Sequence, residues 1–292
     1  MKFQHDGTSV FAADQGREFD PQKPTILFVH GAGLDHSVWP LQARHFAYRG
    51  WNALAIDLPG HGRSKGALLT SIEAMADWLA EIIKALGIKR AALVGHSMGA
   101  LVVLACAARK PKRVSQIALL GAAPRMPVHP TLLEAAARPE TLAPRMICDW
   151  AFGPTGHFGG HRSPGSWMLG HGRSLLDRAA GPRLHTDLAA CNAYENGLAA
   201  AARITCPALV VAGAVDRMTP ARQGAKLAEA IPRARFLSFP QCGHMMIIER
   251  PDSTRDALDG FLSADKQMLE QPKKAGAKKK GRPKAAPKRK SA

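Results

Sequence analysis

Short apolar runs alternate with amphipathic segments over much of the chain, and this alternation predicts its architecture. Runs rich in Val, Ile, Leu and Phe have the length of strands, and the segments between them carry apolar residues at helical spacing. The expected strands are residues 25–30, 51–57, 90–95, 115–120, 208–213 and 234–239, and the expected early helices are 37–49, 71–86 and 97–109. Such alternation predicts an α/β fold with a doubly wound, mostly parallel sheet. An early hairpin that turns at Asp6 and Gly7 is expected before it.

The chain divides into segments of different character. Residues 1–123 and 206–265 carry the alternation and form the expected core. Residues 124–205 interrupt it with many prolines, glycines and histidines and with short helical stretches such as 130–138, so we interpret them as an inserted lid. Residues 266–292 are basic and carry almost no large apolar side chain, which predicts a disordered tail.

A glycine-flanked serine lies where an expected strand turns into an expected helix. The segment Gly95-His96-Ser97-Met98-Gly99 separates the apolar run before it from the helix former that starts at Ala100. Glycines on either side of the serine leave room for a sharp turn that exposes the hydroxyl above the helix N-terminus. This is the context of the G-x-S-x-G nucleophile elbow. Ser97 is therefore the expected nucleophile.

An acid and a histidine follow the serine at the ends of later strands. Asp216 comes just after the run 208–213, and His244 comes shortly after the run 234–239. A serine nucleophile needs a histidine base, and the base needs an acid that holds its tautomer. Open parallel sheets gather such residues at the carboxyl ends of their strands. We therefore expect His244 to be the base and Asp216 its orienting acid.

A glycine-rich loop follows the first expected parallel strand and predicts an oxyanion hole. The loop reads His30-Gly31-Ala32-Gly33-Leu34. Acyl transfer builds negative charge on the carbonyl oxygen, and preorganised backbone N–H groups stabilise that charge. The expected donors are the amides of Met98 and Ala32, with Gly33 as a less favoured alternative. His30 is expected to brace the loop through its side chain.

Together these motifs resemble the α/β-hydrolase-fold serine hydrolases, over roughly residues 1–265 and with Asp57-Leu58-Pro59-Gly60-His61-Gly62-Arg63-Ser64 as a further matching stretch. The resemblance implies an eight-stranded sheet, a lid after the sixth strand, and hydrolysis through an acyl-enzyme. It also implies no cofactor, and we expect no metal. Ester hydrolysis is the expected reaction. A carbon–carbon bond hydrolase, a lactonase, a cofactor-free perhydrolase and a receptor-like binding protein with a retained triad stay open as alternatives.

Apolar residues of the lid and of the acid and base loops are expected to wall a substrate pocket for a small ester. They are Trp150, Phe152, Phe158, Trp167, Met168, Met218 and Met245. Other conspicuous residues are expected to be structural. His96 should point away from the site, the stretch with Asp57, His61 and Arg63 should shape a loop, and Cys242 should be a packed thiol.

The cysteine content and the charge of the chain indicate a cellular compartment and a second possible partner. The five cysteines lack paired spacing, and the chain has neither a signal-peptide core nor an apolar run long enough to span a membrane, so a cytoplasmic protein with reduced thiols is expected. Residues 272–292 hold eight lysines and two arginines without an acid, which is 10 of the net charge of +17. Lys280-Gly281-Arg282-Pro283 resembles an AT-hook core, so this tail could contact DNA or another polyanion.

Overall fold

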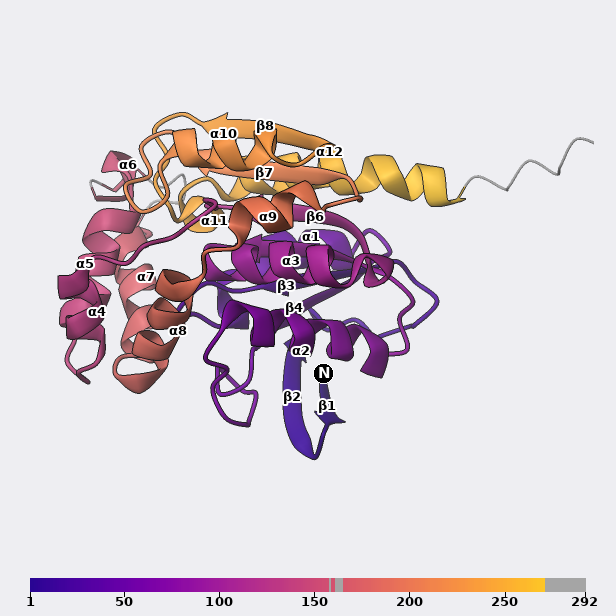
Figure 1. The fold of residues 1–292 in the computed structure, drawn as a ribbon, viewed down its shortest axis with the longest axis horizontal. Coiled ribbons are helices and arrows are strands. Elements are labelled where there is room, and N and C mark those ends of the chain that lie inside the picture. Colours follow the sequence, from indigo (N-terminus) through magenta and orange to yellow (C-terminus); the bar gives the residue numbers. More distant parts are fainter. Residues whose placement is uncertain (158, 161–164, 271–292) are drawn as a thin grey trace, which may run out of the picture.

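An eight-stranded sheet forms the centre of the computed structural model, which describes residues 1–157, 159–160 and 165–270 (Figure 1). The strands lie in the order β1-β2-β4-β3-β5-β6-β7-β8. Their bounds are β1 Lys2–His5, β2 Thr8–Ala13, β3 Thr25–Val29, β4 Asn52–Ile56, β5 Ala91–His96, β6 Val114–Leu120, β7 Ala208–Gly213 and β8 Ala234–Phe239. β1 and β2 form the expected hairpin, β2 runs antiparallel to β4, and the later neighbouring pairs are parallel. The expected α/β fold is confirmed.

The helices follow the strands in nearly the expected places. Before β7 they are η1 His36–Val38, α1 Pro40–Ala47, α2 Ile72–Ala85, α3 Met98–Arg109, η2 Pro111–Arg113, α4 Pro130–Ala136, α5 Leu142–Ala151, α6 Pro154–His157, α7 Met168–Asp177, α8 Pro182–Ala193 and α9 Gly197–Ala202. After β7 they are α10 Ala221–Glu229, α11 Met246–Glu249 and α12 Pro251–Glu270. The helix expected over residues 37–49 is divided at Pro40, which takes the first position of α1 because proline lacks the N–H that a helix interior requires.

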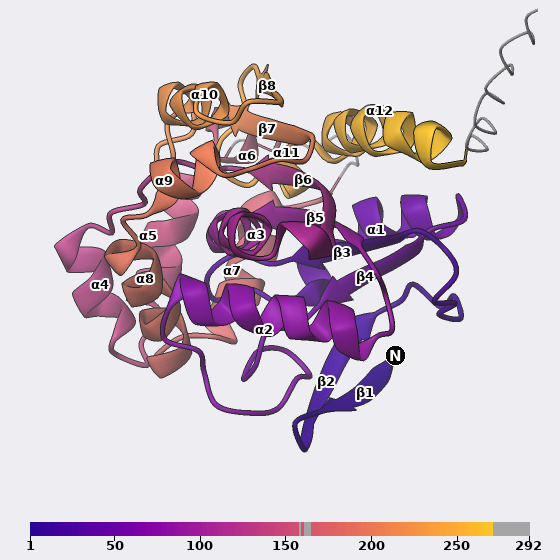
Figure 2. The same ribbon diagram turned by 45° about the vertical axis from the view of Figure 1, so that its right-hand side comes forward.

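Both faces of the central strands are covered by helices. In β3, Leu27 and Val29 pack into a core with α2 and α3, while Ile26 and Phe28 pack into a second core with α1 and α12 (Figure 2). Every residue of β3, β4 and β5 is buried, as strands covered on both faces must be. This double cover explains why their sequences read as continuous apolar runs.

The segment between β6 and β7 places α4–α8, hereafter the inserted helices, together at one end of the sheet (Figure 1). α9 belongs to the same segment but packs against α3 on the sheet and contributes Ala200 and Ala201 to the core there. The inserted helices meet the loops that follow β3, β5 and β6 around a shared cavity. The expected division into core and lid stays a prediction.

Expectations about compartment and partners concern the chain as a whole. Within the described residues no helix is both long and apolar enough to cross a membrane. The five cysteines are buried and none of them forms a disulfide in that part of the chain. Residues 266–270, which the sequence analysis assigned to the disordered tail, are the last residues of helix α12. Lys280, Gly281, Arg282 and Pro283 lie outside the described residues, so the DNA contact and the disorder of residues 271–292 stay predictions, as does the cytoplasmic location.

Candidate active site

Ser97 occupies a strained turn between β5 and α3. Its φ of 54° and ψ of −120° lie in a region that side chains other than glycine rarely adopt. A Cβ at position 95 would collide with the backbone of Gly99, and one at position 99 would collide with the backbone of Val29. The turn is held by a hydrogen bond of 2.9 Å from the Ser97 amide to the carbonyl of Leu120. Both glycines are thus needed because neighbouring backbone fills the space that a side chain would take.

Asp216 and His244 form a buried pair at the carboxyl ends of β7 and β8. His244 Nδ1 lies 2.8 Å from Asp216 Oδ2, and the same oxygen accepts the Thr219 hydroxyl proton at 2.7 Å. The amides of Met218 and Thr219 donate to Oδ1. Burial alone would raise the pKa of Asp216, but His244 and these donors outweigh it and hold the pKa below its usual value. Asp216 therefore carries its charge beside a histidine whose Nδ1 is fixed as a donor.

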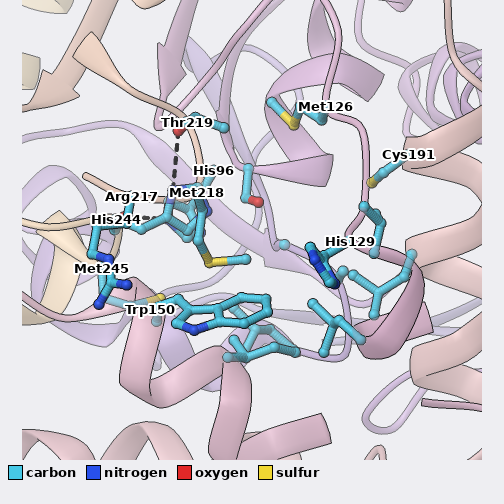
Figure 3. Close-up of a pocket in the computed structure, with 18 of the residues that line it drawn as sticks. His96, Met126, His129, Trp150, Cys191, Arg217, Met218, Thr219, His244 and Met245 are labelled. Atoms are coloured by element: carbon cyan, nitrogen blue, oxygen red, sulfur yellow. Dashed lines mark hydrogen bonds between the residues drawn. The ribbon is translucent and has the colours of Figure 1, made fainter. Parts of the chain in front are cut away.

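His244 lines the same cavity as Ser97, and the second nitrogen of its ring is not paired with Asp216. Nε2 is buried and has no hydrogen-bond partner in the described residues. Figure 3 shows the His244 ring among the residues of this cavity, with the dashed contact to Thr219. The contact with Asp216 favours the neutral tautomer with the proton on Nδ1, and in that tautomer Nε2 carries the lone pair that a general base requires.

His96 does not turn away from the site, as the sequence suggested, but packs on the base. Its ring centroid lies 4.9 Å from that of His244, and its Nε2 lies 2.9 Å from the His244 carbonyl oxygen. Burial lowers the pKa of His96 to about 3, so the ring is neutral and Nε2 donates. The reason is the elbow itself, which turns the side chain before Ser97 toward the neighbouring His244 loop. The expected structural role stays a prediction, and the expected direction of the side chain was wrong.

Glu249, which the sequence reading missed, fixes the loop that carries His244. Its carboxylate is buried in α11 and accepts the amides of Gly153 at 2.8 Å, Gly243 at 3.1 Å and Met245 at 3.2 Å. The His244 amide donates to the carbonyl of Ala151 at 2.5 Å. The base loop is therefore tied to the end of α5. A Glu five positions after the histidine has no clear signal of its own, because one of its partners, the amide of Gly153, comes from a distant loop.

The oxyanion loop presents the amide of Ala32 beside the elbow. Neither this amide nor that of Met98 has a hydrogen-bond acceptor in the part of the chain that the structure describes, and Ala32 lines the same cavity as Ser97. The expectation that Gly33 could donate to the oxyanion is wrong, because its N–H already donates to Asp187 Oδ2 at 2.8 Å. The available donors are therefore those of Ala32 and Met98.

His30 and Asp57 fix the loops that follow β3 and β4 through hydrogen bonds. His30 Nδ1 lies 2.9 Å from the Gly31 carbonyl and His30 Nε2 accepts the Leu58 amide, so His30 is neutral and braces the loop as expected. Burial and the nearby charge of His61 lower the pKa of His30 to about 4. Asp57 shapes the following loop by accepting the amides of His36 and Arg63.

His61 has an acceptor at each nitrogen and therefore carries a proton on both. Nδ1 lies 3.0 Å from the carbonyl of Pro59 and Nε2 lies 2.8 Å from Asp187 Oδ2. Burial alone would lower the pKa of His61, but the hydrogen bond and charge of Asp187 outweigh it and raise the pKa above its usual value. His61 and Asp187 thus form a buried ion pair between the loop after β4 and α8.

This ion pair predicts a pH dependence of stability. Because the folded pKa of His61 is raised, its stabilisation is complete below about pH 6.5, the unfolded value, and is lost as the pH rises through the folded value. We expect the free energy of unfolding from urea titrations at pH 6 to 9 to fall more steeply for wild type than for His61→Gln. His185→Gln on α8 should keep the wild-type slope, and parallel curves for His61→Gln and wild type would contradict the assignment.

The cavity above Ser97 has a volume of about 330 Å³. Trp150, Met218 and Met245 lie on its wall, and Figure 3 shows the Trp150 ring below Met218 and across from His129. Further wall residues that the sequence reading missed are mostly apolar and come from the stretch after β6 and from the inserted helices: Met126, Val128, His129, Leu132, Ile147, Leu176, Leu188 and Cys191. Two signals could have indicated them: the place of Met126, Val128 and His129 in the loop after β6, and the helical spacing of Leu188 and Cys191.

Three other residues expected on the cavity wall, Phe152, Trp167 and Met168, lie elsewhere. Phe152 is buried among the inserted helices, where it packs beside Gly156 and Gly172, because the chain turns at the end of α5. Trp167 and Met168 border a separate hollow next to Leu41 and Ile248, and the Trp167 side chain is largely exposed. Phe158 lies outside the described residues. Cys242 is fully buried, and burial raises the pKa of its thiol, as expected for a packed cysteine.

The sheet, the strained serine and the buried Asp–His pair define a hydrolase of the α/β class. The chain belongs to the alpha/beta hydrolase fold family, whose model matches residues 24–251. It is 33% identical over 237 residues to pimeloyl-(acyl-carrier protein) methyl ester esterase of Chromobacterium violaceum, covering 76% of this chain and 88% of that protein.

Other relatives carry different names. A 2-hydroxy-6-oxononadienedioate/2-hydroxy-6-oxononatrienedioate hydrolase of Paraburkholderia phymatum is 28% identical over 271 residues, with 82% of this chain and 87% of that protein covered. Among solved structures, the enol-lactonase of Burkholderia xenovorans LB400 superposes with a TM-score of 0.77 at 25% identity, covering 90% of this chain and all of that chain (100%). The family thus supports a hydrolytic enzyme and leaves the bond that it cleaves open.

Proposed function

We propose that the chain is a serine hydrolase that cleaves a carboxylic ester through an acyl-enzyme on Ser97. The observation that carries the proposal is the setting of His244, which lines the same cavity as Ser97 and Ala32. Asp216 holds its Nδ1, and its Nε2 has no hydrogen-bond partner among the described residues. His244 is the base and Asp216 the orienting acid. The relative named as a methyl ester esterase supports an ester as the substrate.

The residues suit an acyl-transfer sequence in two halves. Ser97 Oγ attacks the ester carbonyl carbon while His244 Nε2 takes its proton, and the amides of Ala32 and Met98 stabilise the oxyanion. His244 then gives the proton to the departing alcohol, which leaves an acyl-enzyme. Water attacks this acyl group, His244 takes the proton from the water, and Ser97 recovers it as the carboxylic acid leaves.

The wall of the cavity favours a largely hydrocarbon group beside the ester. The side chains contributed by the inserted helices are Leu, Ile, Trp and Cys. The acid and base loops add Met218 and Met245 together with the polar Arg217 and Thr219. Apolar walls with few polar groups are typical of pockets that bind by burying hydrocarbon. We therefore expect activity to rise with acyl length from acetyl until the cavity is filled.

An activity screen tests the proposal. The purified chain would be assayed on p-nitrophenyl esters of increasing acyl length and on a lactone panel, with a fluorophosphonate probe for Ser97. Labelling of Ser97 with turnover of the esters is the expected result. Turnover of lactones alone would favour the reaction named for the enol-lactonase relative. Labelling without turnover of any substrate would favour a receptor-like binding protein.

A further inference from the structure

The carboxylate of Asp187 belongs to the inserted helices, yet its partners lie on the loops beneath the candidate oxyanion hole. Asp187 is fully buried in α8. Its Oδ2 accepts the amide of Gly33 at 2.8 Å and the Nε2–H of His61 at 2.8 Å. A buried carboxylate is costly unless it is paired and hydrogen-bonded, and here the charge of His61 supplies the pairing.

Both peptide groups that flank Ala32 are fixed by hydrogen bonds. The Gly31–Ala32 peptide is fixed through its carbonyl, which accepts from His30 Nδ1 at 2.9 Å and from the Leu34 amide at 3.1 Å. Because carbonyl and N–H point in opposite directions across a trans peptide, these bonds aim the Ala32 N–H away from His30. The Ala32–Gly33 peptide is fixed through the Gly33 N–H, which points to Asp187.

The turn itself needs this second anchor. The hydrogen bond from the Leu34 amide to the Gly31 carbonyl closes a four-residue turn, and Gly33 at its third position has a φ of 67°. A positive φ at that position is the mark of a type II turn. An acceptor for the Gly33 N–H selects this orientation of the central peptide over the flipped one. His61, held by the same carboxylate, packs on the His30 ring at 4.9 Å between centroids.

We propose that Asp187 is a positioning residue for the oxyanion hole: from α8 it fixes the turn that aims the Ala32 amide at the substrate carbonyl. The inference rests on the proposed function of Ser97. It makes the inserted helices a fixed part of the catalytic apparatus rather than only a cover over the cavity.

The test compares Asp187→Ala with Asp177→Ala, the same substitution at an exposed aspartate of α7. Asp187→Ala should lower kcat by about 30- to 100-fold with KM nearly unchanged, since small misplacements of catalytic groups have effects of that size. The inhibition constant of a trifluoromethyl ketone, which forms a tetrahedral adduct on a serine nucleophile, should rise by a similar factor. Asp177→Ala should leave both quantities at wild-type values.

Asp187→Asn keeps an oxygen for the Gly33 amide and can donate to a neutral His61, so it should recover most of the lost activity. If Asp187→Ala does not fold, Asp187→Asn is tested in its place. Its kcat and its affinity for the ketone should both fall by about fivefold relative to wild type. Activities are taken per amount of folded protein, from thermal melts. If folded Asp187→Ala keeps the wild-type kcat and ketone affinity, the positioning role of Asp187 is overturned and the proposed function is not. The same result in Asp187→Asn has this meaning when Asp187→Ala does not fold. A wild type that neither labels with fluorophosphonate nor turns over any ester would overturn the proposed function, and this inference with it.

Discussion

Ser97→Ala should abolish ester hydrolysis while the fold stays intact. Without the hydroxyl there is no oxygen to form the acyl-enzyme, and residual turnover would depend on the oxyanion amides and on binding alone. The expected loss in kcat is roughly a thousandfold or more. Alanine keeps the Cβ that the strained turn already accommodates, so the substitution removes chemistry and little packing. Steady-state kinetics on a p-nitrophenyl ester and a thermal melt measure the two effects.

A matched control for this variant is Ser238→Ala, which makes the same change on the exposed strand β8. It should keep wild-type turnover, and its fluorophosphonate labelling should be unchanged. Labelling should vanish in Ser97→Ala. Retention of more than a tenth of wild-type activity by Ser97→Ala would mean that another group is the nucleophile.

Asp216→Asn should lower kcat by about 10⁴-fold with substrate binding nearly unchanged. The Asn oxygen can still accept the amides of Met218 and Thr219, so its NH₂ takes the place of Oδ2 opposite His244 Nδ1. An NH₂ group donates, so Nδ1 must become the acceptor and the ring proton moves to Nε2. The nitrogen that should receive the Ser97 proton is then already protonated.

Asp149→Asn provides the comparison, because it makes the same change at an exposed acid of α5. This variant should behave as wild type. Normal kcat in Asp216→Asn together with a large loss in Asp149→Asn would move the orienting acid to α5. A pre-steady-state burst in the Asp216→Asn variant as fast as that of wild type would likewise contradict the tautomer argument.

Some residues of the candidate site were predictable because their signals are local. Ser97 is recognisable from glycines two positions away on either side, and the structure shows that neighbouring backbone occupies the space where their side chains would lie. Asp216 and His244 lie in the loops that follow β7 and β8, and parallel pairing brings the ends of these strands to one edge. Their pairing at 2.8 Å follows from that topology. The family resemblance added the number of strands and the place of the insertion.

The errors have a common physical cause. Gly33 looked available for the oxyanion because nothing in its own segment uses its N–H, yet its acceptor is Asp187, which lies 154 positions later. Glu249 was missed because one of its donors, the amide of Gly153, comes from a segment 96 positions earlier. Phe152, Trp167 and Met168 were placed on the cavity wall by composition alone. Which apolar face of a short helix turns inward depends on its neighbours rather than on its own residues.

The sequence by itself determined the elements that rest on short-range rules: strands buried on both faces, the glycine-flanked turn at Ser97, and the order of serine, acid and histidine. Only the tertiary structure decided which amides stay free, which histidine carries charge and which side chains form the wall. These properties depend on hydrogen-bond partners and burial supplied by distant segments. His30 and His61 illustrate the difference, since each precedes a glycine in a loop that follows a parallel strand. The carboxylate of Asp187 makes one of them a cation, and burial keeps the other neutral.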